Sequence, residues 1–452
     1  MIRRLCLLLG LSAVLALAGA GPAAAHNVVV GADLRIAQTI AGAELTLVIK
    51  GTPQVPGPLR IGVETYQAAG ELPIALELRS VTDGRTVTGR LTAGPGDRYT
   101  GLRVETTGPH ELTLRAGGEV AVVPFRVLVD RGSMWEVLIY GGLFAAGVVL
   151  VGGLLTGALS RPGRGTLLVA GAAAGVTVAA MMVVLEPQLP TGPPDGAAPT
   201  ATDRQQAGRP YVQGRVTTLP ERPAAGEEFT LRIDLLDGST GSPVDDLTAH
   251  HEALAHVVVT SEDGRYFRHV HSLRTAPGRL EIRLRADRAG RYRAYTEFER
   301  EDSGGQLISA DFTVGGEPAS PAETAETAET AETAETAETA ETAETAGVRS
   351  AAAVTRPAVP VAGRAATIEV RPTGAVRPWL GMAGHLIVRS ADGEFFGHVH
   401  EMSAAGQVAA QGLRFTYAFP AAGRYLAWAQ YATSGGIVTV PFTVEVTGEP
   451  AR

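Results

Sequence analysis

The sequence His256-Val-Val-Val-Thr-Ser-Glu-Asp-Gly-Arg-Tyr-Phe-Arg-His-Val-His271 recurs later in the chain as His385-Leu-Ile-Val-Arg-Ser-Ala-Asp-Gly-Glu-Phe-Phe-Gly-His-Val-His400. In each copy, strand-forming residues flank an Asp-Gly pair. Asp-Gly between two β-rich runs is a strong hairpin signal, because a type I′ turn needs positive φ at both central positions. We therefore predict two β-hairpins, with two-residue turns at Asp263-Gly264 and Asp392-Gly393.

The position of the turn fixes which residues of each hairpin oppose one another. It places His256 opposite His271 and Val258 opposite His269. Directly opposed side chains share a face of the sheet, with Cβ atoms about 4.5–5.5 Å apart. Each hairpin therefore gathers three imidazoles on one face, and in the second copy these are His385, His398 and His400. The opposite faces are apolar and are predicted to be core: Val257, Val259, Tyr266 and Val270 in the first copy, and Leu386, Val388, Phe395 and Val399 in the second.

Each hairpin lies within a longer internal repeat. Similar segments precede the hairpins, and Gly290-Arg-Tyr292 or Gly423-Arg-Tyr425 follows them. We predict two β-sandwich modules at 211–316 and 351–448. Residues 26–131 also have strand-like patterns separated by turn signals, which is typical of an immunoglobulin-like sandwich of about seven strands. This domain is expected to share the fold of the repeats but not their histidine site.

Two uncharged apolar runs, 137–159 and 166–185, are long enough to cross a membrane, which takes roughly 20 helical residues. Buried helices of a soluble domain are the alternative interpretation. Arg161 and Arg164 in the connection place it in the cytoplasm by the positive-inside rule. Residues 1–25 have the pattern of a secretory signal peptide. The predicted location is the cell membrane, with both large soluble parts extracytoplasmic.

The remaining segments are linkers. Residues 186–210 are rich in Pro, Gly and Ala, and 317–350 contain eight Ala-Glu-Thr units. The second linker should be a solvated spacer that lets the last module move independently. Its glutamates account for the net charge of −8, which leaves no basic patch for nucleic acid. The predicted fold class is mainly β, with three immunoglobulin-like β-sandwich domains and a two-helix transmembrane hairpin.

Six of the ten histidines belong to the two hairpins. A lone histidine on a strand is usually a surface or core residue, but three on one face could bind Cu(II), Zn(II) or Ni(II). His251 is a candidate fourth nitrogen for the first site, while Met382 and Met402 flank the second. A thioether selects Cu(I), although methionine also fills gaps in cores. The candidate metal ligands are His256, His269, His271, His251, His385, His398, His400, Met382, Met402 and His26, the last if cleavage after Ala25 makes it the amino terminus.

The soluble parts lack the motifs of the common hydrolases, nucleotide-binding proteins and zinc proteases. His251-Glu252 begins a zinc-protease motif, but the next histidine comes five residues later and a strand follows. We therefore expect no enzymatic activity. A metal-dependent enzyme with Glu252 or Glu394 as its base is a remote alternative.

The residues His251 to Asp263, followed by Tyr-Phe-Arg-His269-Val-His271, resemble the YtkA-like secreted domains. Trp379 to His400 resembles a variant of the same motif. This family implies immunoglobulin-like sandwiches associated with heavy-metal and copper handling. His26 after an Ala-rich cleavage site is similar to the start of CopC-type periplasmic copper proteins, although the second-half ligands of that family are not evident.

Together these patterns predict a bacterial envelope protein that binds and relays a transition metal. Copper is the first choice, and zinc and nickel stay open. The expected partners are a metal ion, the lipid bilayer and another copper-handling envelope protein. The alternative is an envelope interaction or adhesion protein with structural or pH-responsive histidines.

Overall fold

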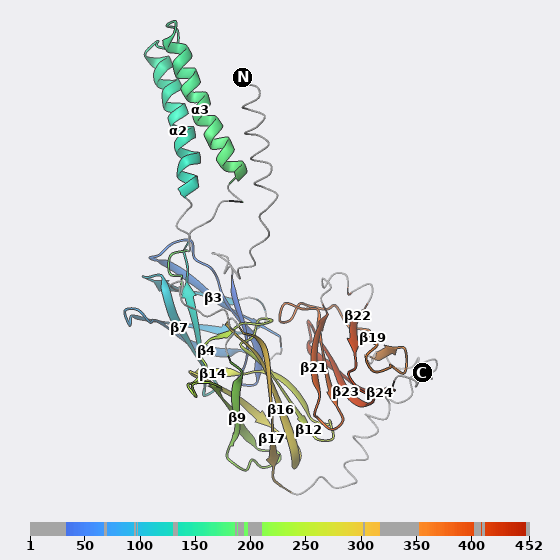
Figure 1. Ribbon diagram of the computed structural model, residues 1–452. Coiled ribbons are helices and arrows are strands. Elements are labelled where there is room, and N and C mark those ends of the chain that lie inside the picture. Colours follow the sequence, from blue (N-terminus) through green and yellow to red (C-terminus); the bar gives the residue numbers. More distant parts are fainter. Residues whose placement is uncertain are drawn as a thin grey trace.

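The computed structural model of the chain describes residues 33–66, 70–94, 96, 98–129, 134–185, 188, 194–197, 210–301, 303–316, 352–401, 408 and 412–448. These residues form a mainly β structure of sandwich-like sheets, from which a pair of helices extends (Figure 1). The predictions for 1–25, His26, 317–350 and Met402 concern residues outside this described part, as does most of 186–210.

The first domain, residues 33–129, contains eight strands rather than about seven. Alternating apolar residues from two four-stranded sheets fill its core, including Leu45, Leu47 and Leu112, each with no exposed surface. One sheet has the order β1(Leu34–Ile40), β2(Ala43–Ile49), β3(Gly57–Thr65), β6(Arg98–Val104), and the other β5(Thr86–Ala93), β4(Leu72–Ser80), β7(Gly108–Ala116), β8(Glu119–Val127).

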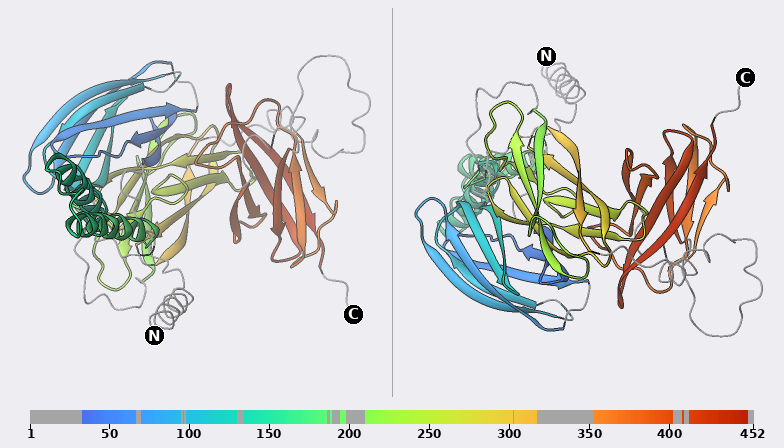
Figure 2. Two further views of the ribbon diagram at one scale, coloured as in Figure 1. Left: turned by 90° about the horizontal axis from the view of Figure 1, so that it is seen from above. Right: turned by 90° about the horizontal axis from the view of Figure 1, so that it is seen from below.

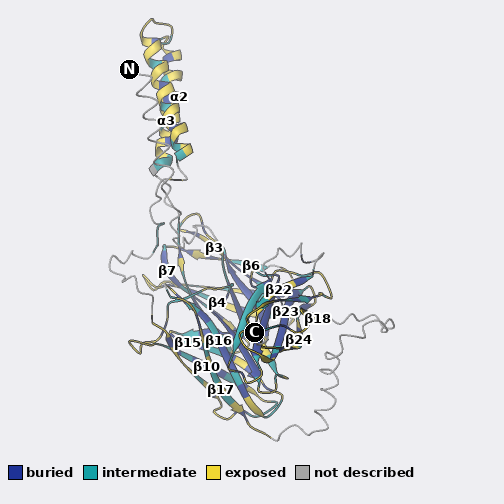
Figure 3. Ribbon diagram, turned by 45° about the vertical axis from the view of Figure 1, so that its right-hand side comes forward, coloured by how far each residue is buried: buried dark blue, intermediate teal, exposed yellow. Residues whose placement is uncertain are grey.

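The two apolar helices are α2(Met134–Leu155) and α3(Arg164–Leu185). Both are long and apolar enough to cross a membrane, with mean hydropathies of 2.2 and 2.3. The first ends at Leu155, before the predicted 159, because Gly157 adopts a left-handed conformation (φ 66°) that stops a helix. Gly142 and Gly175 bring the helices together, since a Cβ on either would lie 2.8 Å from the carbonyl oxygen of the other. Most of the outward side chains are exposed (Figure 3).

The first His module, residues 210–316, is a two-sheet sandwich. Its apolar hairpin face lies in the core, as predicted, with Val257 and Val259 fully buried. One sheet has the order β14(Leu273–Ala276), β15(Arg279–Arg285), β10(Glu228–Asp237), β9(Val212–Leu219), and the other β11(Leu247–Thr248), β16(Gly290–Arg300), β12(Ala255–Ser261), β13(Phe267–His271), with β17(Gly304–Val314) also paired to β16.

The second His module, residues 352–448, repeats this arrangement. Leu386 and Val388 are buried in its core, as predicted for the second hairpin. Its sheets have the orders β18(Ala353–Arg356), β19(Ala365–Val370), β22(Leu413–Ala418) and β21(Phe396–Glu401), β20(Gly384–Ser390), β23(Gly423–Thr433), β24(Gly436–Val446).

The predicted ladder of the hairpins is confirmed, but the predicted turn is wrong. β12 pairs with β13 with His256 opposite His271 and Val258 opposite His269, and β20 pairs with β21 in the same register. The turn is closed by Gly264 N–H donating to the Ser261 carbonyl, and only Gly264 has positive φ. A type I′ turn needs two such residues. Asp263 instead accepts from Ser261 Oγ and Arg265 N–H, which stabilises a longer loop with the same centre.

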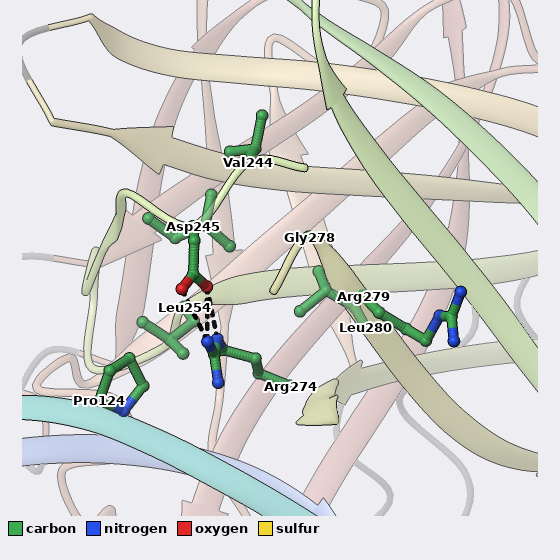
Figure 4. Close-up of a pocket in the computed structure, with 9 residues that line it drawn as sticks. Pro124, Val244, Asp245, Leu254, Arg274, Gly278, Arg279 and Leu280 are labelled. Atoms are coloured by element: carbon green, nitrogen blue, oxygen red, sulfur yellow. Dashed lines mark hydrogen bonds and ion pairs between the residues drawn. The ribbon is translucent and has the colours of Figure 1, made fainter. Parts of the chain in front are cut away.

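The β-sheet segments 33–129, 210–316 and 352–448 pack against one another. Leu254 and Leu273 of the first His module lie in the core cluster of the first domain. Beside this contact, Arg274 is 5% exposed and forms a two-pronged ion pair with Asp245, next to Pro124 of the first domain (Figure 4). The second His module lies against the first (Figure 2), so the structure differs from the expectation of an independent last module.

Candidate metal centre

Strands β12 and β13 direct three imidazole nitrogens toward one point. His256 Nδ1 lies 3.3 Å from His269 Nε2 and 3.2 Å from His271 Nε2. Two nitrogens that each lie about 2.0–2.1 Å from a tetrahedral ion are roughly 3.3–3.4 Å apart. These three residues, here called the first triad, therefore have the spacing of ligands around one metal ion.

The other ring nitrogen of each residue in the first triad faces an oxygen. His256 Nε2 lies 3.1 Å from the His250 carbonyl, His269 Nδ1 lies 2.9 Å from Gln430 Oε1, and His271 Nδ1 contacts Glu44 Oε1. A neutral imidazole has one N–H, and each ring donates it outward to these acceptors. The inward nitrogens then present three lone pairs to one another. Hydrogen bonds among these neutral rings cannot satisfy the lone pairs, whereas a bound cation can.

His385, His398 and His400, here called the second triad, are the equivalent group in the second module. His385 Nδ1 lies 3.3 Å from His398 Nε2, and the ligand atoms of all three lie within 4.8 Å of one another. His385 Nε2 donates to the Trp379 carbonyl at 3.2 Å, and His398 Nδ1 donates to Glu297 Oε2 at 2.8 Å. Within the described part, the buried Nε2 of His400 has no hydrogen-bond partner.

Burial disfavours the charged form of five of these imidazoles. His256 is 3% exposed, and His385 is fully buried. Desolvation lowers the pKa of His269 and of His400 to about 3, and it holds the pKa of His256, His385 and His398 well below the ordinary value of 6.5. Neutral imidazole is the form that ligates metals.

The two triads lie against each other at the contact between the His modules. The ring centroids of His269 and His398 are 5.2 Å apart, and those of His256 and His398 are 5.3 Å apart. Each triad is hydrogen-bonded by the other module: Gln430 on β23 holds His269, and Glu297 on β16 holds His398. The sequence predicted these two groups of three histidines, and the structure places them side by side, which the sequence did not predict.

An approximate two-fold relation organises this contact. Glu297 pairs with His256 in the first module, and Gln430 pairs with His385 in the second. Phe267 stacks on Trp428 at 4.6 Å, and the equivalent Phe396 stacks on Tyr295 at 4.5 Å. Together with Val258 and Ile387, these aromatic residues form an apolar cluster beside the histidines.

The structure moves His251 away from the site predicted for it. Its ring lies 3.9 Å from that of His400, so it contacts the second triad and not the first. The reason is the turn conformation, with positive φ at His251 (47°) and Glu252 (59°). Met382 lies in the equivalent turn of the second module, bridged to Trp379. His110 belongs to neither triad and bonds the Gly108 carbonyl through Nδ1.

The first domain contributes to the site, contrary to the sequence-based expectation. Glu44 on β2 contacts His271 Nδ1, and Thr39 Oγ1 accepts from the His271 backbone N–H at 2.9 Å. Sequence reasoning also missed Glu297 and Gln430. Both are polar residues at matching positions, five after Tyr292 and Tyr425, and this repeated polarity on a core-facing strand is a signal that could have identified them.

Comparison with known proteins finds a match for the two His modules. The family described as "Domain of unknown function (DUF8832)" matches residues 211–317 and 351–448. No curated protein matches the chain.

The chain is also similar to several solved structures. They include dimeric latent PorU from Porphyromonas gingivalis (10% identity, TM-score 0.16, 87% of this chain), of which this chain spans about a third (32%). The chicken CNTN1 FN1–FN3 domains (7% identity, TM-score 0.17, covering 88% and 97% of the two chains) and a two-domain fibronectin type-III segment of chicken tenascin (10%, 0.16, 53% and 99%) are also similar.

Proposed function

We propose that this chain is a membrane-anchored metal-binding protein that holds transition-metal ions in two tri-histidine sites. The observation that carries the proposal is the convergence of three imidazole nitrogens at 3.2–3.3 Å while their outward nitrogens bond oxygen acceptors. In the first triad an accepting oxygen lies behind each ring, and in the second triad one lies behind His385 and His398; such acceptors fix the tautomer and orientation of the ring, as in known metal sites.

Copper is the proposed cargo, and its handling (binding, relay or resistance) is the proposed role. Imidazole suits copper, zinc and nickel alike, and the mature chain lacks a thiolate. Each triad has one carboxylate behind it, Glu44 for the first and Glu297 for the second. Once this carboxylate is ionised, its one negative charge balances a monovalent ion in a buried site, where a net charge is costly. This charge count favours Cu(I).

The two apolar helices are the proposed membrane anchor. Their connection carries Arg161 and Arg164, which on the positive-inside rule belongs in the cytoplasm. Both ends of the helical pair then lead to the extracytoplasmic side, where the β-domains handle the metal.

The test is copper titration of the full-length chain purified in detergent, followed by metal analysis. We expect two ions per chain for the wild type and one when either triad is replaced by alanine. His110→Gln is the control, because it removes a histidine outside both triads. Undiminished copper binding after replacement of all six triad histidines would contradict the proposal and favour structural histidines in an envelope interaction protein.

A further inference from the structure

We infer that His250 and His251 form a solvent-facing uptake site that passes metal to the second triad. This inference rests on the proposed function. The ligand class is a transition-metal ion that binds imidazole, with copper as the proposed case. The step is ligand exchange between imidazoles, in which one metal–nitrogen bond forms as another breaks and no electron is transferred.

The first support is a continuous series of imidazole rings from solvent to the buried centre. His250 is exposed and His251 is half-buried, and their ring centroids are 3.9 Å apart. The His251 ring lies 3.9 Å from that of His400, whose centroid is 4.5 Å from that of His398. From His398 the rings of the first triad are 5.2–5.3 Å away.

The receiving end of this series is suited to accept an ion. His400 Nε2 is buried and has no hydrogen-bond partner in the described residues, so its lone pair or proton is unused. Its ring contacts His251 on one side and the other members of the second triad on the other. An ion released by His251 thus meets an available nitrogen of the triad directly.

The backbone at His251 is held in a left-handed conformation that residues other than glycine rarely adopt. The φ angles of His251 and Glu252 are 47° and 59°. Contacts with the first domain hold the turn: Arg35 Nε donates to Glu252 Oε1 at 2.6 Å, and Ala37 N–H donates to the Glu252 carbonyl at 2.5 Å. Strain maintained by surrounding contacts often accompanies a functional position.

The two repeats differ at this turn, and the difference indicates which triad receives the metal ion first. The position equivalent to His251 is Leu380, also at positive φ (55°) but fully buried in an apolar cluster. Trp379 precedes it, is 1% exposed, and lies between the triads, with its ring 4.8 Å from His385, 5.6 Å from His269 and 6.0 Å from His271. The turn of the first repeat therefore brings an imidazole to the second triad, whereas the equivalent turn of the second repeat has only apolar side chains at these two positions, and metal should reach the second triad first.

The experiment measures copper loading of the full-length chain in detergent. Cu(I) held by a chromophoric chelator is mixed rapidly with the protein, and the loss of chelate colour gives the loading rate. Equilibrium copper content is measured on the same samples. The test variant is His251→Leu, which installs the residue that the second repeat tolerates at the same φ. His250→Ala changes an exposed side chain, and His110→Gln is the control.

We expect His251→Leu to load roughly tenfold more slowly, at the low end of the rate advantage that a guiding site provides, while still binding two ions. His250→Ala should slow loading in the same direction, and His110→Gln should match the wild type. An unchanged rate in His251→Leu, or a fall to one bound ion, would overturn the uptake role while leaving the two-site proposal intact. A wild type that takes up no copper would overturn both.

Discussion

His269 of the first His module donates its Nδ1 proton to Gln430 of the second, across 161 residues of sequence and 2.9 Å of space. The reciprocal contact joins His398 to Glu297. Each module therefore orients one triad ring of the other. On the proposed function, metal occupancy and docking of the modules are linked, because an ion that favours the oriented rings also favours the docked arrangement.

Removing one of these two hydrogen-bond acceptors should lower the metal affinity of the triad whose histidine it contacts. Gln430→Ala should lower copper affinity of the first triad by about 10–100-fold, the usual effect of losing a group behind a metal-ligating histidine. Competition titration with a chelator measures the two affinities. Gln213→Ala, an exposed glutamine on β9, is the matched control. An equal loss at both triads would contradict the assignment of Gln430 to His269.

Glu44 tests the contribution of the first domain. Glu44→Gln keeps the size of the side chain but removes the charge that contacts His271. We expect weaker copper binding at the first triad, again by about 10–100-fold, with the second triad unchanged. Glu77→Gln, in the same domain on β4, is the control. Wild-type affinity at both sites in Glu44→Gln would show that the first domain only supports the fold.

Acid should destabilise the metal-free protein. Histidines of the unfolded chain take up protons below pH 6.5, whereas in the folded protein burial lowers the pKa of His269 and of His400 to about 3. The unfolded state then binds more protons, so stability falls as pH falls from 6.5 toward 4. Burial raises the pKa of Glu297 to about 7, which opposes this trend between pH 4.5 and 7. The histidines with lowered pKa outnumber it: His251, His256, His269, His385, His398 and His400.

Urea unfolding of the metal-free chain between pH 7.5 and 4.5 measures this effect. The unfolding midpoint should decrease with acid. Replacing the second triad by glutamine should flatten the decrease, since three of the titrating rings are removed. A midpoint that rises steadily toward pH 4.5 would contradict the prediction.

The apolar cluster beside the triads should control docking. Trp428 is 3% exposed and stacks on Phe267. Trp428→Ala should cost about 3–5 kcal/mol, the usual range for a buried tryptophan, and release the second His module. Small-angle scattering of the metal-free chain should then show a larger radius of gyration, which copper reverses. Tyr211→Ala, an exposed aromatic residue, is the control, and an unchanged radius in Trp428→Ala would show that docking does not depend on this cluster.

The helical pair offers a matched test with neighbouring glycines. Gly142→Leu should push the helices apart, because a Cβ there would lie 2.8 Å from the Gly175 carbonyl oxygen. At Gly141 no atom lies within 4 Å of the added carbon, so Gly141→Leu is the control. Thermal unfolding in detergent, followed by circular dichroism, should show a lower midpoint for Gly142→Leu only. Equal midpoints would contradict close packing at this position.

Local patterns predicted the parts of this structure that local physics determines. The Asp-Gly centre and strand alternation predicted which histidines oppose one another, although the turn type was wrong because Asp263 caps a longer loop. The packing of the two triads against each other, and against the first domain, could not be predicted in this way. It depends on contacts between domains, such as His271 with Glu44, which are 227 residues apart in the chain. Such contacts arise from how whole sheets pack, and hydrophobic periodicity carries no information about that packing.

The approximate two-fold relation between the His modules has a consequence for assembly. The two modules meet through equivalent faces, with Phe267 stacked on Trp428 and Phe396 stacked on Tyr295. Such a self-complementary face is typical of the interface between identical subunits of a dimer. Here both halves belong to one polypeptide, so their association is intramolecular and independent of protein concentration. Duplication has also freed the halves to diverge. The turn that carries His251 in one half carries Leu380 in the other, a difference that a dimer of identical subunits could not encode.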